Sequence, residues 1–434
     1  MKLPETGRPA PEVLDALEAM RAQDANWRDG RTFSLVYHGG DALLGLLKEA
    51  FFKYFSENAL NPMAFPSLRR METEVVGMVA DLLGAPEAVG SLTTGGTESI
   101  LMAVKTARDF ARSRGIEHPE MVLPISVHPA FEKAAHYFDV KAVHVPVDAD
   151  FRADVDAMRA AINARTILLV GSAPAYPQGV VDPITEIAAL AASHGLLCHV
   201  DACLGGMLLP FVRALGHALP AFDFQVPGVT SMSCDLHKYG YAAKGASVVL
   251  YRERDLRKHQ FVVYADWTGG LYGSPTMCGT RAGGPMAAAW AVLNYLGREG
   301  YLRMADSAMT TAKALQAGIR AEPGLRVLGE PHASIFAFTA DYADIFVLGD
   351  ELAARGWNLD RQNNPNALHM MITQAHAGRV DDFLRDLRAA HAVAVQHGPA
   401  TSGAAAMYGM LGSLPDRGMV REFILDFMDG LDRT

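Results

Sequence analysis

Cysteine is scarce in this chain of 434 residues, which contains four: Cys198, Cys203, Cys234 and Cys278. None of them forms a CxxC pair or the Cys/His spacing of a zinc site. So few cysteines in a chain of this length do not make a disulfide framework. The sequence therefore predicts no metal site and favours a reducing compartment, the cytoplasm.

Long apolar runs and an excess of positive charge are also missing. Residues 1–30 carry charged side chains throughout and lack the apolar core of a signal peptide. No stretch of about 18 uncharged apolar residues occurs elsewhere, so we expect a soluble protein without a transmembrane helix. The net charge of -9 argues against a nucleic-acid partner, because binding to phosphates of any sequence needs Lys and Arg.

The chain does contain a regular alternation of short β-branched runs and longer helical patterns from about Gly90 onward. Apolar residues recur on one face between Thr97 and Arg114, whereas Leu196–Val200 is a short, mainly apolar run. Strands separated by helices imply right-handed crossovers and a mostly parallel sheet that is covered on both faces. We therefore expect a large α/β domain at 71–305, a smaller α+β domain at 306–434 and an N-terminal segment at 1–70.

The segment TTGGTES, Thr93–Ser99, stands directly before the first amphipathic helix. Gly96 lets the backbone approach an anion, Thr97 offers a hydroxyl, and the helix N-terminus adds exposed N–H groups. This pattern is typical of a phosphate cradle. A plain glycine turn that enters a helix has the same residue types, so the motif alone leaves both interpretations open.

Asp201 directly follows the apolar run Leu196–Val200. A buried carboxylate is costly unless it is paired, so we expect Asp201 to meet a cation or a strong donor such as a protonated pyridine nitrogen. The alternative is an Asp that caps a turn at the end of the strand.

The segment SCDLHKYGYAAKG, residues 233–245, follows another predicted strand. A lysine that forms a Schiff base must present a neutral amine, and we expect burial or a cationic neighbour to lower the pKa of Lys238 for this purpose. His237 can donate to a phosphate oxygen, and Lys244 can approach an anionic substrate. Taken separately, such residues are more often a solvated lysine and a loop histidine.

These three segments all follow predicted strands, where open α/β sheets bind their ligands. An anion cradle, a buried acid and a lysine supply the contacts that pyridoxal 5'-phosphate (PLP) needs at its phosphate, pyridine nitrogen and aldehyde. We therefore expect a PLP enzyme of fold type I whose cofactor is carried on Lys238.

The sequence also resembles the sphingosine-1-phosphate lyases, within the PLP-dependent decarboxylases and lyases. The similarity extends from about Ser34 to Met410. The matching runs are GGTESILMAVKTARD, APAYPQGVVDPI, HVDACLGGMLLPF, TSMSCDLHKYGYAAKGASVVLY, DWTGGLYGSPTMCGTRAGG and RGWNL. Matches of this length are specific for the family and less specific for the substrate.

The resemblance implies a homodimer with two composite active sites, to which residues 1–70 contribute. It makes Lys238 the cofactor lysine, pairs Asp201 with the pyridine nitrogen and stacks His128 on the cofactor ring. The residues implied to bind the cofactor phosphate are Gly96, Thr97, His237, the partner's Gly279 and the partner's Thr280. The residues implied to surround the substrate phosphate are Tyr37, Lys244 and Ser274.

The chain departs from this family at one position near the substrate. Relatives have NPLHPD before FP, whereas residues 58–63 here are NALNPM, so Asn61 replaces the family histidine. Asn can donate a hydrogen bond but cannot become cationic. We therefore expect weaker binding of a doubly charged phosphate, or a different natural substrate. We also expect no membrane anchor like that of animal relatives, so the enzyme would draw a lipid substrate from a membrane or a micelle.

The reaction that the resemblance implies is retro-aldol cleavage of a phosphorylated long-chain amino alcohol to a fatty aldehyde and phosphoethanolamine. Released Lys238, Tyr37, Lys244 or the substrate phosphate could take the hydroxyl proton, and the sequence does not choose among them. An amino-acid decarboxylase is the alternative enzyme, and it would need a cationic clamp for a carboxylate. A catalytically idle binding protein would be expected to lack Lys238 or Asp201.

Overall fold

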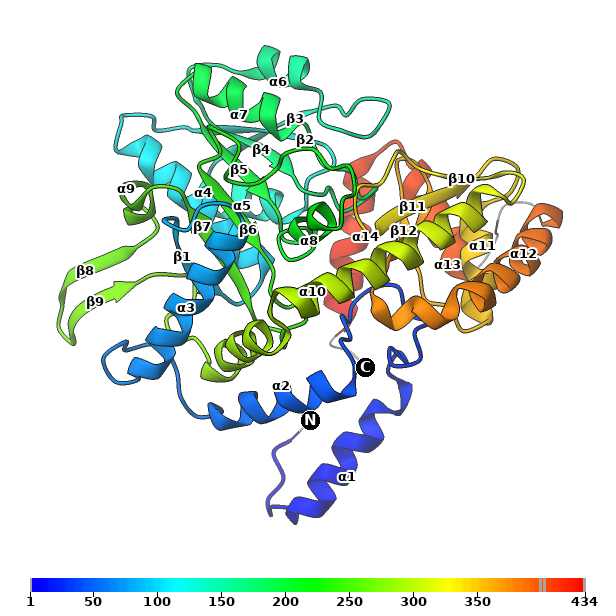
Figure 1. The fold of residues 1–434 in the computed structure, drawn as a ribbon, viewed down its shortest axis with the longest axis horizontal. Helices are drawn as coiled ribbons and strands as arrows, with labels where there is room; N and C mark the ends of the chain where they lie inside the picture. Colours follow the sequence, from blue (N-terminus) through cyan, green and yellow to red (C-terminus); the bar gives the residue numbers. More distant parts are fainter. Residues whose placement is uncertain (1, 398–399, 401–402, 432–434) are drawn as a thin grey trace.

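The computed structural model describes residues 2–397, 400 and 403–431. Its largest element is a seven-stranded sheet with the strand order β1-β7-β6-β5-β4-β2-β3 (Figure 1). The strands are β1 (Val89–Thr93), β2 (Glu120–Pro124), β3 (Lys141–Val145), β4 (Thr166–Ser172), β5 (Leu197–Asp201), β6 (Ser231–Cys234) and β7 (Ser247–Tyr251). All pairs from β6 to β3 are parallel, and β7 runs antiparallel to both of its neighbours. The expected mostly parallel α/β sheet is confirmed.

Helices cover both faces of this sheet, which explains the mainly apolar residues of strands such as β2 and β4. Along β2, Met121 and Leu123 belong to one core with two helices, α4 (Gly96–Arg112) and α5 (Ala130–Phe138). Val122 belongs to the other core with α3 (Pro66–Leu82), α7 (Ile184–Ser193) and α10 (Gly283–Arg320). Successive side chains of a strand point to opposite faces, so a strand buried on both faces needs apolar residues throughout. The helices of this region are α2 (Asp41–Lys53), α3 (Pro66–Leu82), α4 (Gly96–Arg112), α5 (Ala130–Phe138), α6 (Val155–Ala161), α7 (Ile184–Ser193), α8 (Leu209–Ala214) and α9 (Arg254–Lys258).

A smaller antiparallel sheet follows in the C-terminal part, with the strand order β10-β11-β13-β12. Its strands are β10 (Leu325–Val327), β11 (Ile335–Ala340), β12 (Asp360–Gln362) and β13 (Ala367–Met371). The helices in this part are α11 (Ile345–Ala354), α12 (Val380–Gln396), α13 (Gly403–Ser413) and α14 (Arg417–Gly430), with the 3-10 turn η2 (Gln374–Arg379). The short, polar β12 is the strand that the sequence pattern does not predict.

The long helix α10 (Gly283–Arg320) connects the two sheets and is kinked at Gly297, which has φ 54°. Met309 packs in the core of the large sheet, whereas Ala312 packs in the core of the small one. The sequence-based boundary between residues 305 and 306 therefore falls inside this helix.

Two elements project from the body in Figure 1: α1 (Ala10–Met20), which the 3-10 turn η1 (Arg21–Gln23) follows, and a hairpin of β8 (Val262–Trp267) and β9 (Gly270–Ser274). No residue of α1 is buried, and all of β8 is exposed. Among the described residues, no helix is both long and apolar enough to cross a membrane.

The sequence pattern predicts Asp182 as the N-cap of the helix after β4, and this prediction is wrong. Helix α7 starts at Ile184 with Pro183 at the N-cap position. The Asp182 carboxylate instead accepts hydrogen bonds from the backbone N–H groups of Ala153 at 2.8 Å and Ser172 at 2.7 Å. The Asp182 side chain therefore hydrogen-bonds to a neighbouring loop and strand and does not cap the N-terminus of α7.

Candidate active site

A cavity of about 530 Å³ lies at the carboxyl ends of the strands of the large sheet. It is lined by residues that end or follow β1, β4, β5 and β6, such as Gly96, Tyr176, Asp201 and Lys238. Ligands of open α/β sheets bind at this edge, because the loops that leave parallel strands converge there. Eight residues that were predicted for the site line this one cavity: Tyr37, Gly96, Thr97, His128, Asp201, His237, Lys238 and Lys244.

The segment before α4 has the geometry of an anion cradle. Thr93 Oγ1 and Ser99 Oγ lie 2.7 Å apart, which holds the turn closed at its base. A Cβ atom at Gly96 would lie 2.7 Å from Asp235 Oδ2 and equally close to the sulfur of Cys203, so only glycine fits there. The N–H groups at the start of this 17-residue helix can thus bind a phosphate without a side chain in the way.

Asp201 ends β5 with one carboxylate oxygen already engaged. Its Oδ1 accepts from the backbone N–H of Cys203 at 3.0 Å and from Ser233 Oγ at 3.2 Å. Among the described residues none donates to Oδ2, while the side chain lines the cavity and is only 7% exposed. A protonated ring nitrogen would satisfy this second oxygen, so the arrangement fits the pyridine end of PLP.

His128 lies in the same cavity as a neutral imidazole. Its Nδ1 accepts from the backbone N–H of Ala130 at 3.1 Å. Burial lowers the pKa of His128, and the positive charge of Lys238 also lowers it against the opposing effect of Asp201. An uncharged flat ring beside these two residues is suited to packing against an aromatic cofactor.

Lys238 has its Nζ 3.0 Å from Oδ2 of Asp235, three residues earlier in the chain. The sequence-based expectation of a lowered pKa is wrong. Burial does lower it, but the nearby carboxylates, chiefly Asp235, outweigh burial and raise the pKa of Lys238 above its ordinary value. The free lysine is therefore a cation. Asp235 is a site residue that sequence reasoning missed, although its place one turn before Lys238 was a usable signal.

Three other predicted residues, His237, Lys244 and Tyr37, line the same cavity as Lys238. His237 Nδ1 accepts from the backbone N–H groups of Gly245 and Ala246, each at 3.2 Å, which leaves Nε2 as the donor nitrogen. Lys244 Nζ lies 5.3 Å from the centre of the Tyr37 ring. Burial, followed by the charge of Lys238, lowers the pKa of Lys244. This side of the cavity is thus rich in groups that bind anions.

Four other predicted residues, Asn61, Ser274, Gly279 and Thr280, are not among those that line the cavity. Asn61 is exposed and accepts from the backbone N–H of Met63 at 2.9 Å. Ser274 is buried, and its hydroxyl donates to the carbonyl of Thr276 at 3.1 Å. In a single chain these residues therefore do not meet Lys238.

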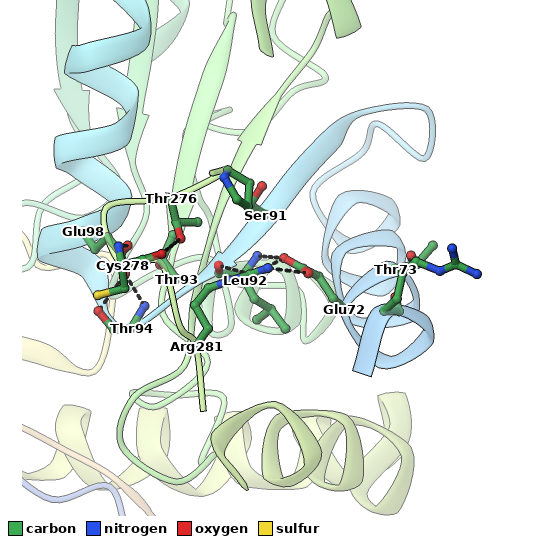
Figure 2. A network of polar contacts seen from close by, with 12 residues as sticks. Glu72, Thr73, Ser91, Leu92, Thr93, Thr94, Glu98, Thr276, Cys278 and Arg281 are labelled. Atoms are coloured by element: carbon green, nitrogen blue, oxygen red, sulfur yellow. Dashed lines mark hydrogen bonds and ion pairs between the residues drawn. The ribbon is translucent and has the colours of Figure 1, made fainter. Parts of the chain in front are cut away.

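The segment that contains Gly279 and Thr280 is nevertheless tied to the anion cradle (Figure 2). Glu98 accepts from the backbone N–H of Thr94 at 2.6 Å with one oxygen, and from those of Met277 at 2.9 Å and Cys278 at 3.3 Å with the other. Arg281 donates to the Leu92 carbonyl at 3.0 Å and forms an ion pair with Glu72.

The lining of the cavity contains two further residues that sequence reasoning missed. Tyr176 and Asp360 both line the cavity, and the tyrosine hydroxyl donates to Asp360 Oδ2 at 2.9 Å. Tyr176 lies within the matching run APAYPQGVVDPI, and Asp360 directly follows the matching run RGWNL. Those runs were the available signal, but nothing in the sequence indicated that they meet.

Comparisons with known proteins agree with this geometry. The model of the pyridoxal-dependent decarboxylase conserved domain matches residues 2–341. A sphingosine-1-phosphate lyase of Arabidopsis thaliana is 48% identical over 429 residues, which cover 96% of this chain and 79% of the relative. Sphingosine-1-phosphate lyase 1 of Rattus norvegicus is 43% identical over 437 residues, which cover 100% of this chain and 77% of the relative.

Solved structures extend the likeness to three dimensions. A sphingosine-1-phosphate lyase of Burkholderia pseudomallei has a TM-score of 0.91 and 41% identity over 99% of this chain and 97% of that chain. A glutamate decarboxylase of Lactobacillus brevis, at 21% identity and a TM-score of 0.80 over 92% of this chain and 96% of that chain, shares the fold. This chain therefore belongs to the sphingosine-1-phosphate lyases, within the pyridoxal-dependent decarboxylase family.

Proposed function

We propose that this protein is a PLP-dependent aldehyde-lyase that cleaves a phosphorylated long-chain base of the sphingosine-1-phosphate type. The products are a fatty aldehyde and phosphoethanolamine. The observation that supports this most strongly is the meeting of Lys238, Asp201 and the Gly96–Thr97 cradle in one cavity, in a chain of this family. Each of these groups matches a different end of the same cofactor.

Bound PLP would supply an electron sink for a bond that breaks at the carbon bearing the substrate amine. Gly96, Thr97 and His237 Nε2 would hold its phosphate, with the start of α4 as further donor. Asp201 Oδ2 would keep the ring nitrogen protonated through a charge-assisted hydrogen bond. His128 would lie against the ring, and Lys238 would bind the aldehyde carbon.

Lys238 also has a role after the substrate amine displaces it. Because Asp235 raises the pKa of the free lysine, Nζ is protonated in the cavity at neutral pH. A charged ammonium group can give a proton to a carbon but cannot take one from a hydroxyl. Lys238 therefore suits the final protonation step and not the removal of the hydroxyl proton.

Substrate recognition rests on Tyr37 and Lys244, whose side chains adjoin each other at the cavity wall. We propose that a second subunit completes the site as a homodimer with composite sites: its Gly279 and Thr280 at the cofactor phosphate, and its Asn61 and Ser274 at the substrate phosphate. Support comes from the position of these residues outside the cavity lining of their own chain. Ser274 ends β9 of the exposed hairpin, and a Cβ at Gly279 would lie 3.7 Å from the Tyr272 hydroxyl of the same strand.

Residues 1–70, 71–305 and 306–434 remain our proposed division into an N-terminal segment, a PLP-binding domain and a small C-terminal domain. The two hydrophobic cores, one at each sheet, support the two larger parts, with the change from one core to the other between Met309 and Ala312 in α10. We also propose that the enzyme acts in the cytoplasm and takes its lipid substrate from a membrane surface or a micelle.

Product analysis tests the proposed function. Purified protein loaded with PLP is incubated with phosphorylated sphingoid bases and, separately, with amino acids. We expect release of a long-chain aldehyde and phosphoethanolamine in equal amounts from the former. Carbon dioxide release from an amino acid, without aldehyde from any phosphorylated base, would instead identify a decarboxylase.

A further inference from the structure

The hydrogen bond between Tyr176 and Asp360 joins two distant parts of the chain inside the cavity. The tyrosine hydroxyl donates to Asp360 Oδ2 at 2.9 Å, and both side chains line the same cavity as Lys238. Tyr176 follows β4 of the large sheet, whereas Asp360 begins β12 of the small sheet. Their pairing therefore depends on how the two sheets pack, and the roles described above do not use it.

Both partners of this hydrogen bond are held in place. The ring of Tyr176 stacks on His369, with centroids 4.2 Å apart, and His369 Nε2 lies 2.9 Å from the carbonyl oxygen of Tyr176. The other oxygen of Asp360 accepts from Ser34 Oγ at 3.2 Å. Groups fixed in this way lose little freedom when a substrate binds, which is what catalytic side chains require.

The direction of the hydrogen bond determines what the phenol can do next. Burial, followed by the charge of Asp360, raises the pKa of Tyr176 above its ordinary value, so the hydroxyl stays protonated at neutral pH. A phenol has a single proton, and here that proton points to Asp360. The tyrosine oxygen can then only accept a hydrogen bond from the cavity side. A substrate hydroxyl is a donor of that kind.

Tyr37, the other cavity phenol considered for this proton, has a weaker acceptor. Its hydroxyl donates to the sulfur of Met371 at 3.1 Å. A thioether accepts hydrogen bonds weakly and does not take up a proton in water. Tyr176 is thus the better placed of the two phenols, since its hydroxyl already donates its proton in a hydrogen bond to a carboxylate.

We propose that Tyr176 and Asp360 together take the proton of the substrate hydroxyl during carbon–carbon cleavage, an inference that rests on the proposed function. The substrate O–H bond breaks as its proton passes to the Tyr176 oxygen, while the phenol proton passes to Asp360 Oδ2. The aldehyde C=O forms as the carbon–carbon bond breaks, and the electron pair of that bond goes to the sink described above. Once the aldehyde has left, Tyr176 releases the proton taken from the substrate to water that enters the cavity, and Asp360 gives its proton back to the tyrosine oxygen.

The test uses the PLP-loaded variants Tyr176→Phe and Asp360→Asn. We measure kcat and KM for aldehyde release, and the Kd of a substrate analogue that lacks the reacting hydroxyl. Loss of a general base lowers rates by about 10²–10⁴-fold, and we expect kcat to fall within that range while the Kd of the deoxy analogue changes less than about twofold. A merely structural role would weaken binding of the analogue as well.

Asp386→Asn is the matched control, because Asp386 accepts from the indole N–H of Trp357 at 2.9 Å in the same C-terminal part but does not line the cavity. Its kcat should stay close to that of the wild type. Near-normal kcat in Tyr176→Phe, or equal losses of kcat and analogue affinity, would overturn this inference but leave the proposed function standing. If Asp360→Asn does not fold, Tyr176→Phe still decides, since it removes only one hydroxyl. Absence of aldehyde from the wild type would overturn the proposed function and this inference with it.

Discussion

The cavity around Lys238 and the hairpin of β8 and β9 differ in how completely one chain builds them. Around Lys238, segments from both sheets converge, and the predicted side chains already have partners such as Asp235 and Ser233. In the hairpin, by contrast, Val263 is 76% exposed and Leu271 is 87% exposed. Exposed apolar side chains grouped on one element mark an interaction surface. We infer that one chain forms the cofactor half of the site, and that the hairpin region belongs to the half that a second copy completes.

The largest expected effect comes from the chain's own half of the site. Lys238→Ala should abolish aldehyde release and the covalent link to PLP, because it removes the amine that binds the aldehyde. The measurement is borohydride reduction of the holoenzyme followed by peptide mapping, with Lys244→Ala as the control that keeps the link. A pyridoxyl group found on Lys244 or on any other lysine in the wild type would contradict the assignment.

A second large effect concerns the pair of Lys238 and Asp235. Only the neutral amine attacks the aldehyde, and Asp235 raises the pKa of that amine, so the wild type should take up PLP faster as the pH rises. Asp235→Asn lowers this pKa. PLP uptake at neutral pH should then be faster by about tenfold for each unit by which the pKa of Lys238 falls. The uptake rate should also level off at a lower pH than in the wild type.

The growth of visible absorbance after PLP is added to cofactor-free enzyme follows this uptake across the pH range. Asp360→Asn is the control, because Asp360 lies in the same cavity but pairs with Tyr176. It should keep the pH dependence of the wild type. An Asp235→Asn profile that also matches the wild type would show that Asp235 does not set the pKa of Lys238.

Subunit mixing tests the comparison between the two regions most directly. Gly279→Asp should inactivate the homodimer by blocking the partner's site, because a Cβ at Gly279 has no neighbour closer than 3.7 Å in its own chain. Mixed with Lys238→Ala by co-expression, it should restore about a quarter of wild-type activity, since half of the dimers are mixed and each has one intact site.

The control for this experiment mixes Lys238→Ala with Asp201→Ala, two changes in the same chain's cavity. No mixed dimer then has an intact site, so activity should not return. No recovery with Gly279→Asp would mean that Gly279 serves the site of its own chain. Recovery in the control would mean that Lys238 and Asp201 do not belong to the same site, against their shared cavity.

The smallest effect is expected for Asn61→His. A charged donor contributes about 1.5 to 3 kcal/mol to a hydrogen bond against about 1 for a neutral one, so the KM for a phosphorylated base should fall several-fold. The fall should grow as the pH drops from about 8 towards 6.5, where histidine gains its charge. Below that, protonation of the phosphate near pH 6 opposes it.

Asn58→His is the matched control, because Asn58 accepts from the backbone N–H of Leu60 at 3.2 Å in the same kind of turn as Asn61. Its KM should not depend on pH in this way. If the two variants behave alike, Asn61 does not face the substrate phosphate.

Elements whose burial is uniform could be predicted from the sequence, and elements whose burial is mixed could not. Leu196–Val200 was recognisable as a strand because both faces of β5 are covered, which favours mainly apolar residues. The exposed β8 and β9 hairpin and the half-buried β12 have no such pattern. Local residue types do not distinguish strands of that kind from loops.

The sequence by itself determined the α/β order and the Lys238, Asp201 and Gly96 constellation, because each of these follows from a local pattern at the end of a strand. Only the tertiary structure decided the charge of Lys238 and the pairing of Tyr176 with Asp360. A pKa depends on every charge within a few ångströms, and a hydrogen bond between the two sheets depends on how they pack. Both properties depend on distances between residues that are far apart in the sequence, and a local sequence pattern does not give those distances.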